Sequence, residues 1–461
     1  MTTLTIAEVE IDGFRGRLIS ADDADYDGVR AVWNGAIDRR PRPIARCIGT
    51  ADVVAAVRFA RERDLEVAIR GGGHNVAGSA VCDDGIVIDL SAMRGVRVDP
   101  AGRRAWVQGG ALWGDVDHET QAHGLATTGG IVSHTGVAGL TLGGGVGWLM
   151  RKHGLTVDNL LAADVVTADG ALLRASEREH SDLFWALRGG GGNFGVVTSF
   201  EFRLHCVGPT VLAGPILWDA ADAGEVLRFY RDFLRDAPDE LGTVVRFGAA
   251  PPIPAIPAYL HWRPVVMVGT CYAGPVEDGE RSLRPLRAFR TPLLDLVGPA
   301  PYVGFQSALD STVLHGWNYY WKSTHLPELR DELIDAIAAH AFSSSSPRSY
   351  AAMFHLKGAV GRVAEGATAF GNRKASHAIT LDGVWRPGED FGERDTAWTR
   401  KFFAALGRFR EGVYVNFLGG DEAPDRVREA YGDAVYDRLV EVKTKYDPDN
   451  VFHHNQNIRP G

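Results

Sequence analysis

Cysteine is scarce in this chain of 461 residues, which has only Cys47, Cys82, Cys206 and Cys271. No CxxC pair is present, so in a large chain without a secretion signal we expect buried thiols rather than disulfides. The HExxH zinc motif is missing, and we therefore expect no metal site. The Walker loop of NTPases and the GxSxG elbow of α/β-hydrolases are missing too, which removes the usual anchors of those two functions.

Basic residues are also few, since 49 Lys and Arg stand against 58 Asp and Glu and give a formal charge of −9. A nucleic-acid-binding surface needs a basic excess, so we expect no nucleic acid partner. No apolar run reaches membrane-spanning length, and the N-terminal MTTLTIAEVEIDGF lacks a basic start followed by an apolar core. We expect a cytoplasmic protein without a membrane partner. The lack of long heptads favours a monomer or homodimer.

Glycine, by contrast, is abundant, and its 55 residues gather in clusters. The first cluster, Arg70-Gly71-Gly72-Gly73-His74-Asn75, follows a strand predicted over 66–70. Small residues let backbone N–H groups turn towards a phosphate, because no Cβ blocks the approach. A loop built only to hold phosphate does not need an imidazole, so His74 is a candidate functional residue. The alternative is a surface turn with an incidental histidine.

Two further glycine clusters follow along the chain. The stretch 129–147, GGIVSHTGVAGLTLGGGVG, has Val and Leu between its glycines, which argues against a flexible linker. The stretch 188–198, RGGGGNFGVVT, contains a formal GxGxxG. A Rossmann loop must follow a strand and open a helix, whereas here a predicted helix comes first and a strand follows. We therefore interpret these clusters as backbone pressed against one long ligand, outside a Rossmann fold.

The pattern of predicted elements divides the chain into three parts. Residues 43–205 mix helices over 50–63 and 109–124 with strands over 85–90, 104–108 and 196–202, as expected for an α+β cofactor domain. Residues 211–410 carry strands over 265–271 and 351–357, a helix over 326–341 and a proline-rich loop over 250–257. We interpret this part as a substrate domain whose sheet roofs the cofactor.

The loop over 70–79 resembles the pyrophosphate loop of FAD-linked oxidases related to berberine bridge enzyme, in the vanillyl-alcohol oxidase superfamily. The second glycine cluster, the run Tyr414-Val415-Asn416 and the C-terminal run through Asn455-Gln456-Asn457 resemble the same family in the same order. The resemblance implies an α+β fold with a PCMH-type FAD-binding domain of two α/β subdomains over 1–210. It further implies an α+β substrate domain over 211–413, with an antiparallel sheet flanked by helices, and a segment over 414–461 that returns to the FAD domain.

The resemblance also implies how FAD is held. In this family the histidine that matches His74 is bonded covalently to the 8α-methyl group of the flavin. Many relatives have a second link from a cysteine at or next to Val132, but no cysteine lies between Cys82 and Cys206. We therefore expect a single covalent link through His74. The other residues implied to bind the cofactor are Gly71, Gly72, Gly73, Asn75, Ser79, Thr135, Gly136, Gly139, Gly143, Gly144, Gly147, Asp158, Asn159, Val197, Asn455 and Asn457.

Catalysis in the family moves a hydride to the flavin while a base takes a proton from the substrate. Tyr414 resembles the family's Tyr-x-Asn near the flavin ring, with Asn416 on the same strand face. On a strand over 353–357, alternation puts His355 and Lys357 on one face. A cation beside a tyrosine would lower its pKa and favour the phenolate. Tyr414, Lys357 and His355 are thus three candidate bases, and ordinary strand packing or solvent exposure is the alternative for each.

These inferences predict an FAD-dependent oxidoreductase, most simply an oxidase. Its substrate is a small alcohol, amine or phenolic molecule, and oxygen is the expected electron acceptor, giving hydrogen peroxide. The departure from the two-link pattern favours a smaller substrate. Two alternatives stay open: a flavin dehydrogenase with another acceptor, and a homologue that binds flavin or a ligand without turnover.

Overall fold

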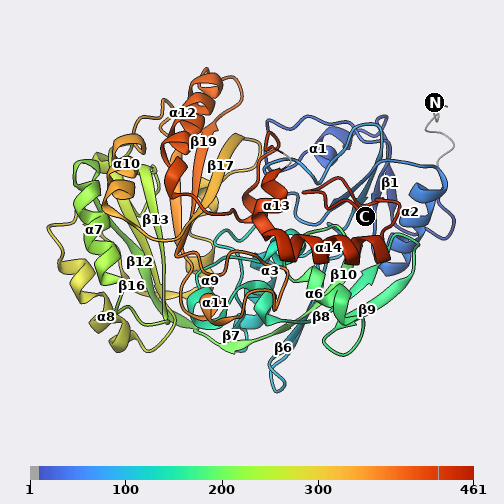
Figure 1. The fold of residues 1–461 in the computed structure, drawn as a ribbon, viewed down its shortest axis with the longest axis horizontal. Coiled ribbons are helices and arrows are strands. Elements are labelled where there is room, and N and C mark those ends of the chain that lie inside the picture. The colour runs from blue at the N-terminus through green and yellow to red at the C-terminus, as the bar shows by residue number, and fades with distance from the viewer. Residues whose placement is uncertain (1–9, 424) are drawn as a thin grey trace.

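The structure is a computed structural model that describes residues 10–423 and 425–461. Two halves lie side by side along the longest axis (Figure 1). One half is formed by the chain up to β11 together with the C-terminal segment, and the other by the chain from β12 to α12. Both halves combine sheets with helices, so the predicted α+β fold class is confirmed.

The first half contains two main sheets, and the first of them has four strands. Its strands are β1 (Arg17–Ile19), β2 (Ile44–Arg46), β4 (Ile86–Asp89) and β3 (Val67–Arg70), in that spatial order. Strands β2, β4 and β3 run parallel, and β1 is antiparallel to β2. The central strand β4 is buried along its whole length, as the apolar run IVI of a parallel sheet requires. Helix α2 (Thr50–Glu62) packs against this sheet through Val53, Ala56 and Val57.

The second sheet of this half is antiparallel and has five strands. In spatial order they are β5 (Val96–Asp99), β6 (Arg104–Gln108), β10 (Val196–Arg203), β8 (Leu160–Val166) and β9 (Leu172–Ser176). A separate pair joins β7 (Leu125–Ala126) to β11 (His205–Cys206). The other helices of this half that precede its C-terminal segment are α1 (Tyr26–Arg30), α3 (Trp113–Gln121), α4 (Val137–Gly143), α5 (Met150–His153), the 3-10 helix η2 (Thr156–Asn159) and α6 (Ser181–Leu187).

The second half is built on one eight-stranded antiparallel sheet. Its path runs through β15 (Leu294–Asp295), β12 (Thr210–Asp219), β14 (Pro264–Tyr272), β13 (Leu241–Ala249), β18 (Tyr350–His355), β19 (His377–Trp385) and β17 (Asn318–Leu326), while β16 (Gly298–Pro301) pairs with β12. Four helices cover its outer face: α7 (Ala223–Phe233), α8 (Val276–Ala288), α10 (Asp331–His340) and α12 (Gly392–Ala405) (Figure 1). The other face turns towards the first half. The short helices α9 (Tyr302–Gln306) and α11 (Ala359–Arg362) lie at the junction with it.

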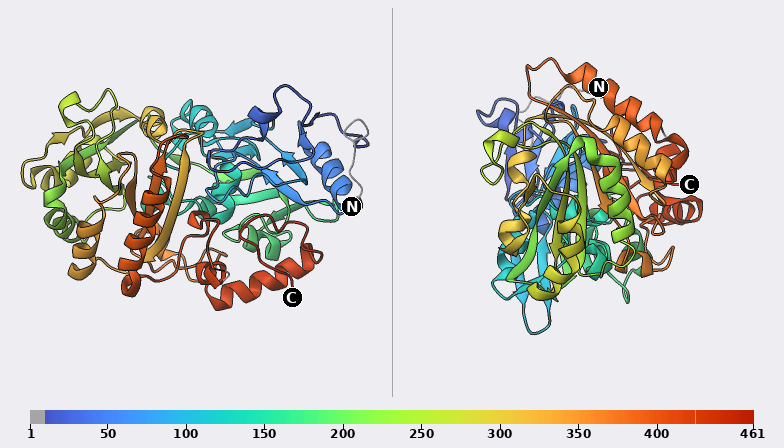
Figure 2. Two further views of the ribbon diagram at one scale, coloured as in Figure 1. Left: turned by 90° about the horizontal axis from the view of Figure 1, so that it is seen from above. Right: turned by 90° about the vertical axis from the view of Figure 1, so that its left-hand side faces the viewer.

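The C-terminal segment returns to the first half. After the 3-10 helix η7 (Val415–Phe417), helices α13 (Asp425–Tyr431) and α14 (Asp433–Tyr446) lie along that half, as the two views of Figure 2 show. The buried Lys443 donates from Nζ to Asp447 at 2.5 Å and to the carbonyl of Asn193 at 2.8 Å. This pair ties the tail to the third glycine cluster.

The four cysteines are free thiols, and Cys47, Cys82 and Cys271 are buried as predicted. The prediction is wrong for Cys206, which is exposed because it belongs to the two-residue strand β11 outside both main sheets. In residues 10–423 and 425–461, no helix combines the length and the apolar character needed to cross a membrane.

Candidate active site

A cavity of about 380 Å³ lies where the three glycine clusters meet the inner face of the large sheet. The glycine-rich backbone of the first half and the large sheet of the second half both line this cavity, and together they form its wall. Of the residues predicted to bind the cofactor or act in catalysis, the following line it: Gly71, Gly72, Gly73, His74, Asn75, Ser79, Thr135, Gly136, Gly139, Val197, Asn455 and Tyr414. Their roles remain predictions, but the structure brings these twelve residues together from distant parts of the sequence.

The glycines leave room for a large ligand along this wall. A Cβ added at Gly139 or at Gly192 would have no heavy atom within 4 Å, so side chains there would project into open space. Both residues line the cavity, so a ligand can approach the backbone closely at these points. Gly73 has φ +66°, a left-handed conformation that favours glycine. A cavity wall with such open backbone positions can take a long ligand such as a dinucleotide, so its residues fit FAD.

His74 is held on two sides within this wall. The indole of Trp33 stacks on its imidazole, with ring centroids 4.4 Å apart and an interplanar angle of 14°. Its Nε2 lies 3.2 Å from Nδ1 of His134. Burial, followed by the neighbouring His134 and His315, lowers the pKa of His74 well below the ordinary histidine value. His74 is therefore a neutral imidazole at pH 7, with a lone pair available on one nitrogen.

Tyr414 reaches the same cavity from the C-terminal segment. Its hydroxyl oxygen accepts hydrogen bonds from the backbone N–H of Gly145 and from Nδ2 of Asn416, both at 2.7 Å. Burial raises the pKa of Tyr414 to about 12, although these two donors oppose the shift. The phenol is therefore protonated at neutral pH. Tyr414 is the N-cap of η7 rather than part of a strand, yet this turn keeps Tyr414 and Asn416 together.

The end of the second glycine cluster packs against protein groups, whereas its earlier residues line the cavity. Gly143, Gly144 and Gly147 do not line the wall, contrary to the prediction. A Cβ on Gly143 would lie 2.1 Å from Oδ1 of Asn416, and one on Gly144 would lie 2.5 Å from the Phe370 ring and 3.1 Å from the Tyr414 ring. Gly143 and Gly144 are small because the backbone there passes directly against Asn416, Phe370 and Tyr414, whereas Gly147 packs against the carbonyl of Gly129. The sequence shows the need for small residues but not which neighbour imposes it.

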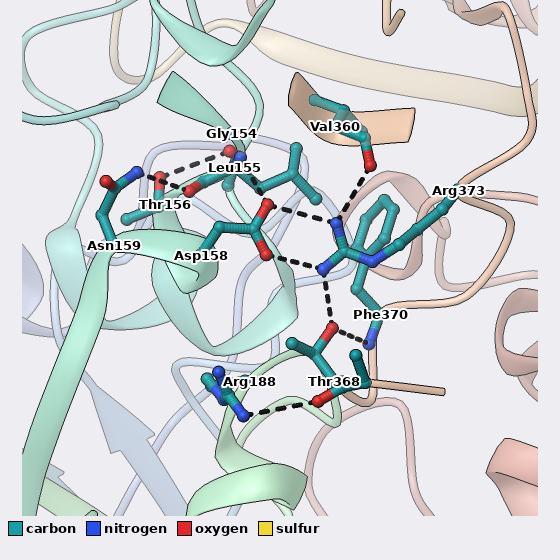
Figure 3. Close-up of polar contacts among 12 residues, drawn as sticks. Gly154, Leu155, Thr156, Asp158, Asn159, Arg188, Val360, Thr368, Phe370 and Arg373 are labelled. Atoms are coloured by element: carbon teal, nitrogen blue, oxygen red, sulfur yellow. Dashed lines mark hydrogen bonds and ion pairs between the residues drawn. The ribbon is translucent and has the colours of Figure 1, made fainter. Parts of the chain in front are cut away.

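Asp158 and Asn159 also lie outside the cavity wall. Figure 3 shows Asp158, on η2, facing Arg373 of the other half, and the two side chains form a bidentate pair at 2.7 and 3.1 Å. The guanidinium is also bonded to Thr368 Oγ1 at 2.7 Å. Asn159 donates to the carbonyls of His153 and Leu155. Asp158 thus forms a buried link between the two halves, and Asn159 stabilises a turn.

His355 and Lys357 do not reach the cavity. Strand β18 ends at His355, and Lys357 lies beyond it, exposed, donating from Nζ to the carbonyl of Lys374 at 3.0 Å. The residues of β18 that line the cavity are Tyr350, Ala352 and Phe354, so His355 points to the opposite face and stacks on His377. The prediction that placed Lys357 beside the tyrosine is wrong. The predicted strand over 353–357 is also too long, because β18 ends at His355, and alternation does not reveal which face meets the cavity when both faces are buried.

The inner face of the large sheet carries groups that sequence reasoning missed. Asp382 of β19 pairs in register with Tyr350 of β18 and Trp321 of β17, and all three line the cavity. Arg246 of β13 lines it one row further along, its guanidinium 4.5 Å from the centroid of the Tyr350 ring. Asp382 is the only carboxyl group among the described residues of the wall. The one sequence signal that could have indicated Asp382 is a single acidic residue within the otherwise apolar strand run ITLDGVW.

Asp382 is a buried carboxyl group with a shifted pKa. Burial raises its pKa to about 7, while the hydroxyl of Thr380, which donates to Oδ2 at 2.7 Å, and the charge of Arg246 oppose the shift. Its Oδ1 is buried and has no hydrogen-bond partner among the described residues. Such an orphaned carboxylate oxygen facing a cavity is expected where a ligand completes the hydrogen bonding.

At the end of the chain, His454, Asn455 and Gln456 line the cavity, but Asn457 does not. Asn455 donates from Nδ2 to the carbonyl of Gly192 at 3.3 Å, so the tail closes over the third glycine cluster. The residues missed there by sequence reasoning, Gly191, Gly192 and Asn193, belong to the formal GxGxxG that does not open a Rossmann helix. The glycines of this cluster did indicate that the backbone approaches a ligand closely. The sequence excluded only a Rossmann loop there, not a ligand contact.

The glycine cradle, the PCMH-like pairing of two sheets and the tail that returns to them define an FAD-binding oxidoreductase. Residues 41–176 match the family model of an FAD binding domain, and residues 413–459 match that of berberine and berberine-like proteins. The chain belongs to the berberine bridge enzyme-like family of FAD-linked oxidases, as the resemblance predicted, and it is an enzyme.

Individual relatives match almost the whole chain. (R)-6-hydroxynicotine oxidase of Paenarthrobacter nicotinovorans is 34% identical over 464 residues, which cover 97% of each chain. Glucooligosaccharide oxidase of Sarocladium strictum is 27% identical over 95% of this chain and 90% of its own. The crystal structure of 6-hydroxy-D-nicotine oxidase from Arthrobacter nicotinovorans superimposes with a TM-score of 0.86 at 31% identity, covering 100% of both chains.

Proposed function

We propose that this protein is an oxidase that removes a hydride from a small alcohol, amine or phenolic substrate and passes the electrons to oxygen, giving hydrogen peroxide. One observation carries the proposal: a single cavity joins the glycine cradle with His74 to a sheet face that bears one buried carboxyl group, Asp382. When bound, the flavin supplies the two-electron acceptor. The chain must then bind the substrate, exclude water and hold its proton.

We further propose that FAD is attached by a single covalent bond, through His74. Glucooligosaccharide oxidase from Acremonium strictum has a 6-S-cysteinyl, 8α-N1-histidyl FAD. In this chain Val132 lines the cavity where the alignment on the triple glycine places that cysteine. None of the four cysteines lines the cavity, so a second link through sulfur has no donor among the described residues of the wall.

The proton of the substrate goes, in this proposal, to Asp382. A general base works best when its pKa lies near the operating pH, and the pKa of Asp382 is about 7. Tyr414, with a pKa of about 12, keeps its proton and can donate it to a polar atom of the substrate. Sequence reasoning favoured Tyr414 as the base, but the cation that would have lowered its pKa is absent from its described surroundings.

The lining of the sheet face favours a largely apolar substrate. Val244, Met267, Ala352 and Phe354 form much of it, and Trp321 closes one side, with its ring 5.8 Å from that of Phe417. The polar groups are few, namely Asp382, Arg246, Tyr350 and Thr380. Few polar groups in an apolar wall fix the orientation of a small molecule rather than bind an extended polar chain. A compact aromatic or alicyclic molecule with one oxidisable hydroxyl or amine fits this lining.

The test uses the purified protein with its flavin. Anaerobic mixing with a panel of small alcohols, amines and phenols should bleach the visible flavin absorbance for the substrate class, and admission of oxygen should restore it with one equivalent of peroxide. Bleaching that only an artificial acceptor reverses would identify a dehydrogenase instead. If no member of a broad panel bleaches the flavin, the non-catalytic alternative gains the support that the oxidase loses.

A further inference from the structure

An arginine without an acidic partner lines the cavity on the side of the large sheet. Arg246 of β13 is half-buried and is one of the wall residues. Its side chain makes one hydrogen bond to the described residues, from Nη1 to the carbonyl of Ala249 on the same strand, at 2.8 Å. A guanidinium has five N–H donors and keeps its charge in proteins. Most of these donors therefore have no acceptor in residues 10–423 and 425–461.

The neighbours of Arg246 in the sheet do not balance its charge. In register it lies between Met267 of β14 and Ala352 of β18, two apolar residues that also line the cavity. Its guanidinium lies over the ring of Tyr350, 4.5 Å from the centroid, a contact that is attractive but supplies no negative charge. Burial lowers the pKa of Arg246, as expected for a cation in an apolar wall. Proteins normally pair a charge in such a place.

Asp382, the carboxyl group that we propose as the base, does not pair with this arginine. Its side chain accepts a hydrogen bond from Thr380, and its Oδ1 has no partner among the described residues. In register, Arg246 is joined across Ala352 to Thr380, two residues before Asp382. Two strand steps of ~4.8 Å and two residues of ~3.4 Å place the backbones of Arg246 and Asp382 about 12 Å apart. The cavity thus offers a cation and a carboxyl group at two separate places.

We propose that the substrate is an organic acid whose carboxylate binds Arg246 while its oxidisable hydroxyl or amine lies at Asp382. The inference rests on the proposed oxidase function and names its substrate class. A planar guanidinium binds a carboxylate through two parallel N–H···O bonds, which fixes orientation as well as affinity. Because the two groups stand on strands two steps apart, the carboxylate and the oxidised carbon belong at opposite ends of the molecule rather than on adjacent carbons. Arg246 determines specificity and transfers neither proton nor hydride.

Three ligands of one shape and three charges test the inference by binding alone. They are para-methylbenzoate, para-methylbenzamide and para-methylbenzamidine, whose end groups are negative, neutral and positive and nearly equal in size. None of them has an oxidisable hydroxyl or amine, so the flavin stays oxidised. Isothermal titration calorimetry gives the Kd of each ligand for the flavin-loaded protein.

The variants separate the charge of Arg246 from its shape. Arg246→Met removes the charge and keeps an unbranched stem, and Arg246→Lys keeps the charge without the planar fork. Arg348→Met is the matched control, because Arg348 belongs to the same half and lies over the rings of Trp262 and Trp317, at 5.7 and 5.3 Å, but does not line the cavity. Flavin absorbance and urea unfolding check that each variant is folded and loaded.

We expect the wild type to bind the carboxylate about 10-fold or more tighter than the amide, and the amidinium most weakly. Arg246→Met should weaken the carboxylate about 10- to 10²-fold, the loss typical of hydrogen bonds to a charged group, and leave the amide near its wild-type Kd. Arg246→Lys should lie between the two. Arg348→Met should leave all three Kd values unchanged.

Turnover gives a second measurement that a merely structural role would not reproduce. The substrates are para-(hydroxymethyl)benzoate and para-(aminomethyl)benzoate, each compared with its amide. Arg246→Met should raise KM for the acids about 10- to 10²-fold and leave kcat nearly unchanged, because the carboxylate is held equally before and during hydride transfer. Both constants for the amides should stay near the wild-type values.

Three results would overturn the inference. The first is equal binding of carboxylate and amide by the wild type, and the second is tighter binding of the amidinium. The third is equal weakening of all three ligands in Arg246→Met, which would show that Arg246 shapes the wall or faces the flavin. Failure of the proposed function has a different signature, because the acid would then bind through Arg246 while no alcohol or amine reduces the flavin.

Discussion

Replacement of Asp382 by Asn should slow flavin reduction strongly and, at the same time, stabilise the protein. The substitution keeps the size of the side chain, and the amide oxygen can still accept the hydrogen bond that Thr380 donates at 2.7 Å. It removes only the negative charge and the capacity to take a proton. Because these two properties act on different observables, one substitution tests both the catalytic role and the burial of Asp382.

The magnitude for stability follows from the raised pKa. Burial raises the pKa of Asp382 from an ordinary 3.8 to about 7, so the folded protein favours the neutral carboxyl group. Below about pH 4 both the folded and unfolded chains hold the proton, and the group has no effect. As the pH rises towards 7 the unfolded chain loses the proton first, and stability falls by up to about 4 kcal/mol at 1.36 kcal/mol per unit. Asp382→Asn should recover this free energy of unfolding at about pH 8 and little of it near pH 4.

The magnitude for catalysis follows from the lost base. General base assistance is typically worth ~10² to 10⁴ in rate, so anaerobic stopped-flow reduction by substrate should slow by that order. In the wild type the reduction rate should rise with pH and level off above about pH 7, where Asp382 is ionised. In Asp382→Asn that rise should disappear, while reoxidation by oxygen stays near the wild-type rate.

Asp117 provides the matched control. It is also buried, its pKa is raised by burial to about 7, and it accepts a hydrogen bond from Gln306 at 3.0 Å, but it does not line the cavity. Asp117→Asn should therefore stabilise the protein at about pH 8 in the same way and leave flavin reduction unchanged. The reasoning is refuted if Asp382→Asn reduces its flavin at a near-normal rate, or if both variants slow it equally.

Three further predictions concern the surroundings of the site. Tyr414→Phe removes one hydrogen-bond donor to the substrate, worth ~1.5 to 3 kcal/mol when the acceptor gains charge. Stopped-flow flavin reduction should therefore slow about 10- to 10²-fold and still rise with pH. Loss of that rise would identify Tyr414 as the base. Arg373→Met leaves the Asp158 carboxylate buried without its guanidinium and should lower the free energy of unfolding, measured in urea, by about 3 to 5 kcal/mol. Adding Asp158→Asn to this variant should recover part of the loss. If neither the single nor the double variant changes the free energy of unfolding, the pair has no structural role. Burial lowers the pKa of His325 and of His377 to about 3. Each therefore contributes stability that is complete above about pH 6.5 and is lost as the pH falls towards 3, at ~1.4 kcal/mol per pH unit. Urea unfolding at about pH 7 and pH 5 should show this loss, and equal stability at the two pH values would contradict it.

Local sequence signals predicted much of the fold. The strand over 104–108 is β6 to the residue, and the helix and strand that surround the third glycine cluster are α6 and β10. The reversed order of that helix and strand correctly excluded a Rossmann loop. These elements were predictable because their periodicity and flanking glycines are properties of neighbouring residues.

The parts of the site that sequence did not predict depend on packing between distant segments. Strand β18 is buried on both faces, so its alternation of side chains did not reveal that Phe354, and not His355, faces the cavity. Asp382 became a candidate only when β19 was placed beside β18 over the cradle. Likewise, Gly143 is small because Asn416, 273 residues later, packs against it.

The central claim, a flavin held at His74 in an oxidase of this family, is tested most directly by the identity of the residue that carries the cofactor. Wild-type protein is precipitated with acid, digested, and its yellow peptides are sequenced by mass spectrometry. We predict that the pellet stays yellow and that the flavin mass lies on a single peptide, at His74, with no flavin on any cysteine peptide. A colourless pellet with free FAD in the supernatant, or flavin attached at another residue, would contradict the account.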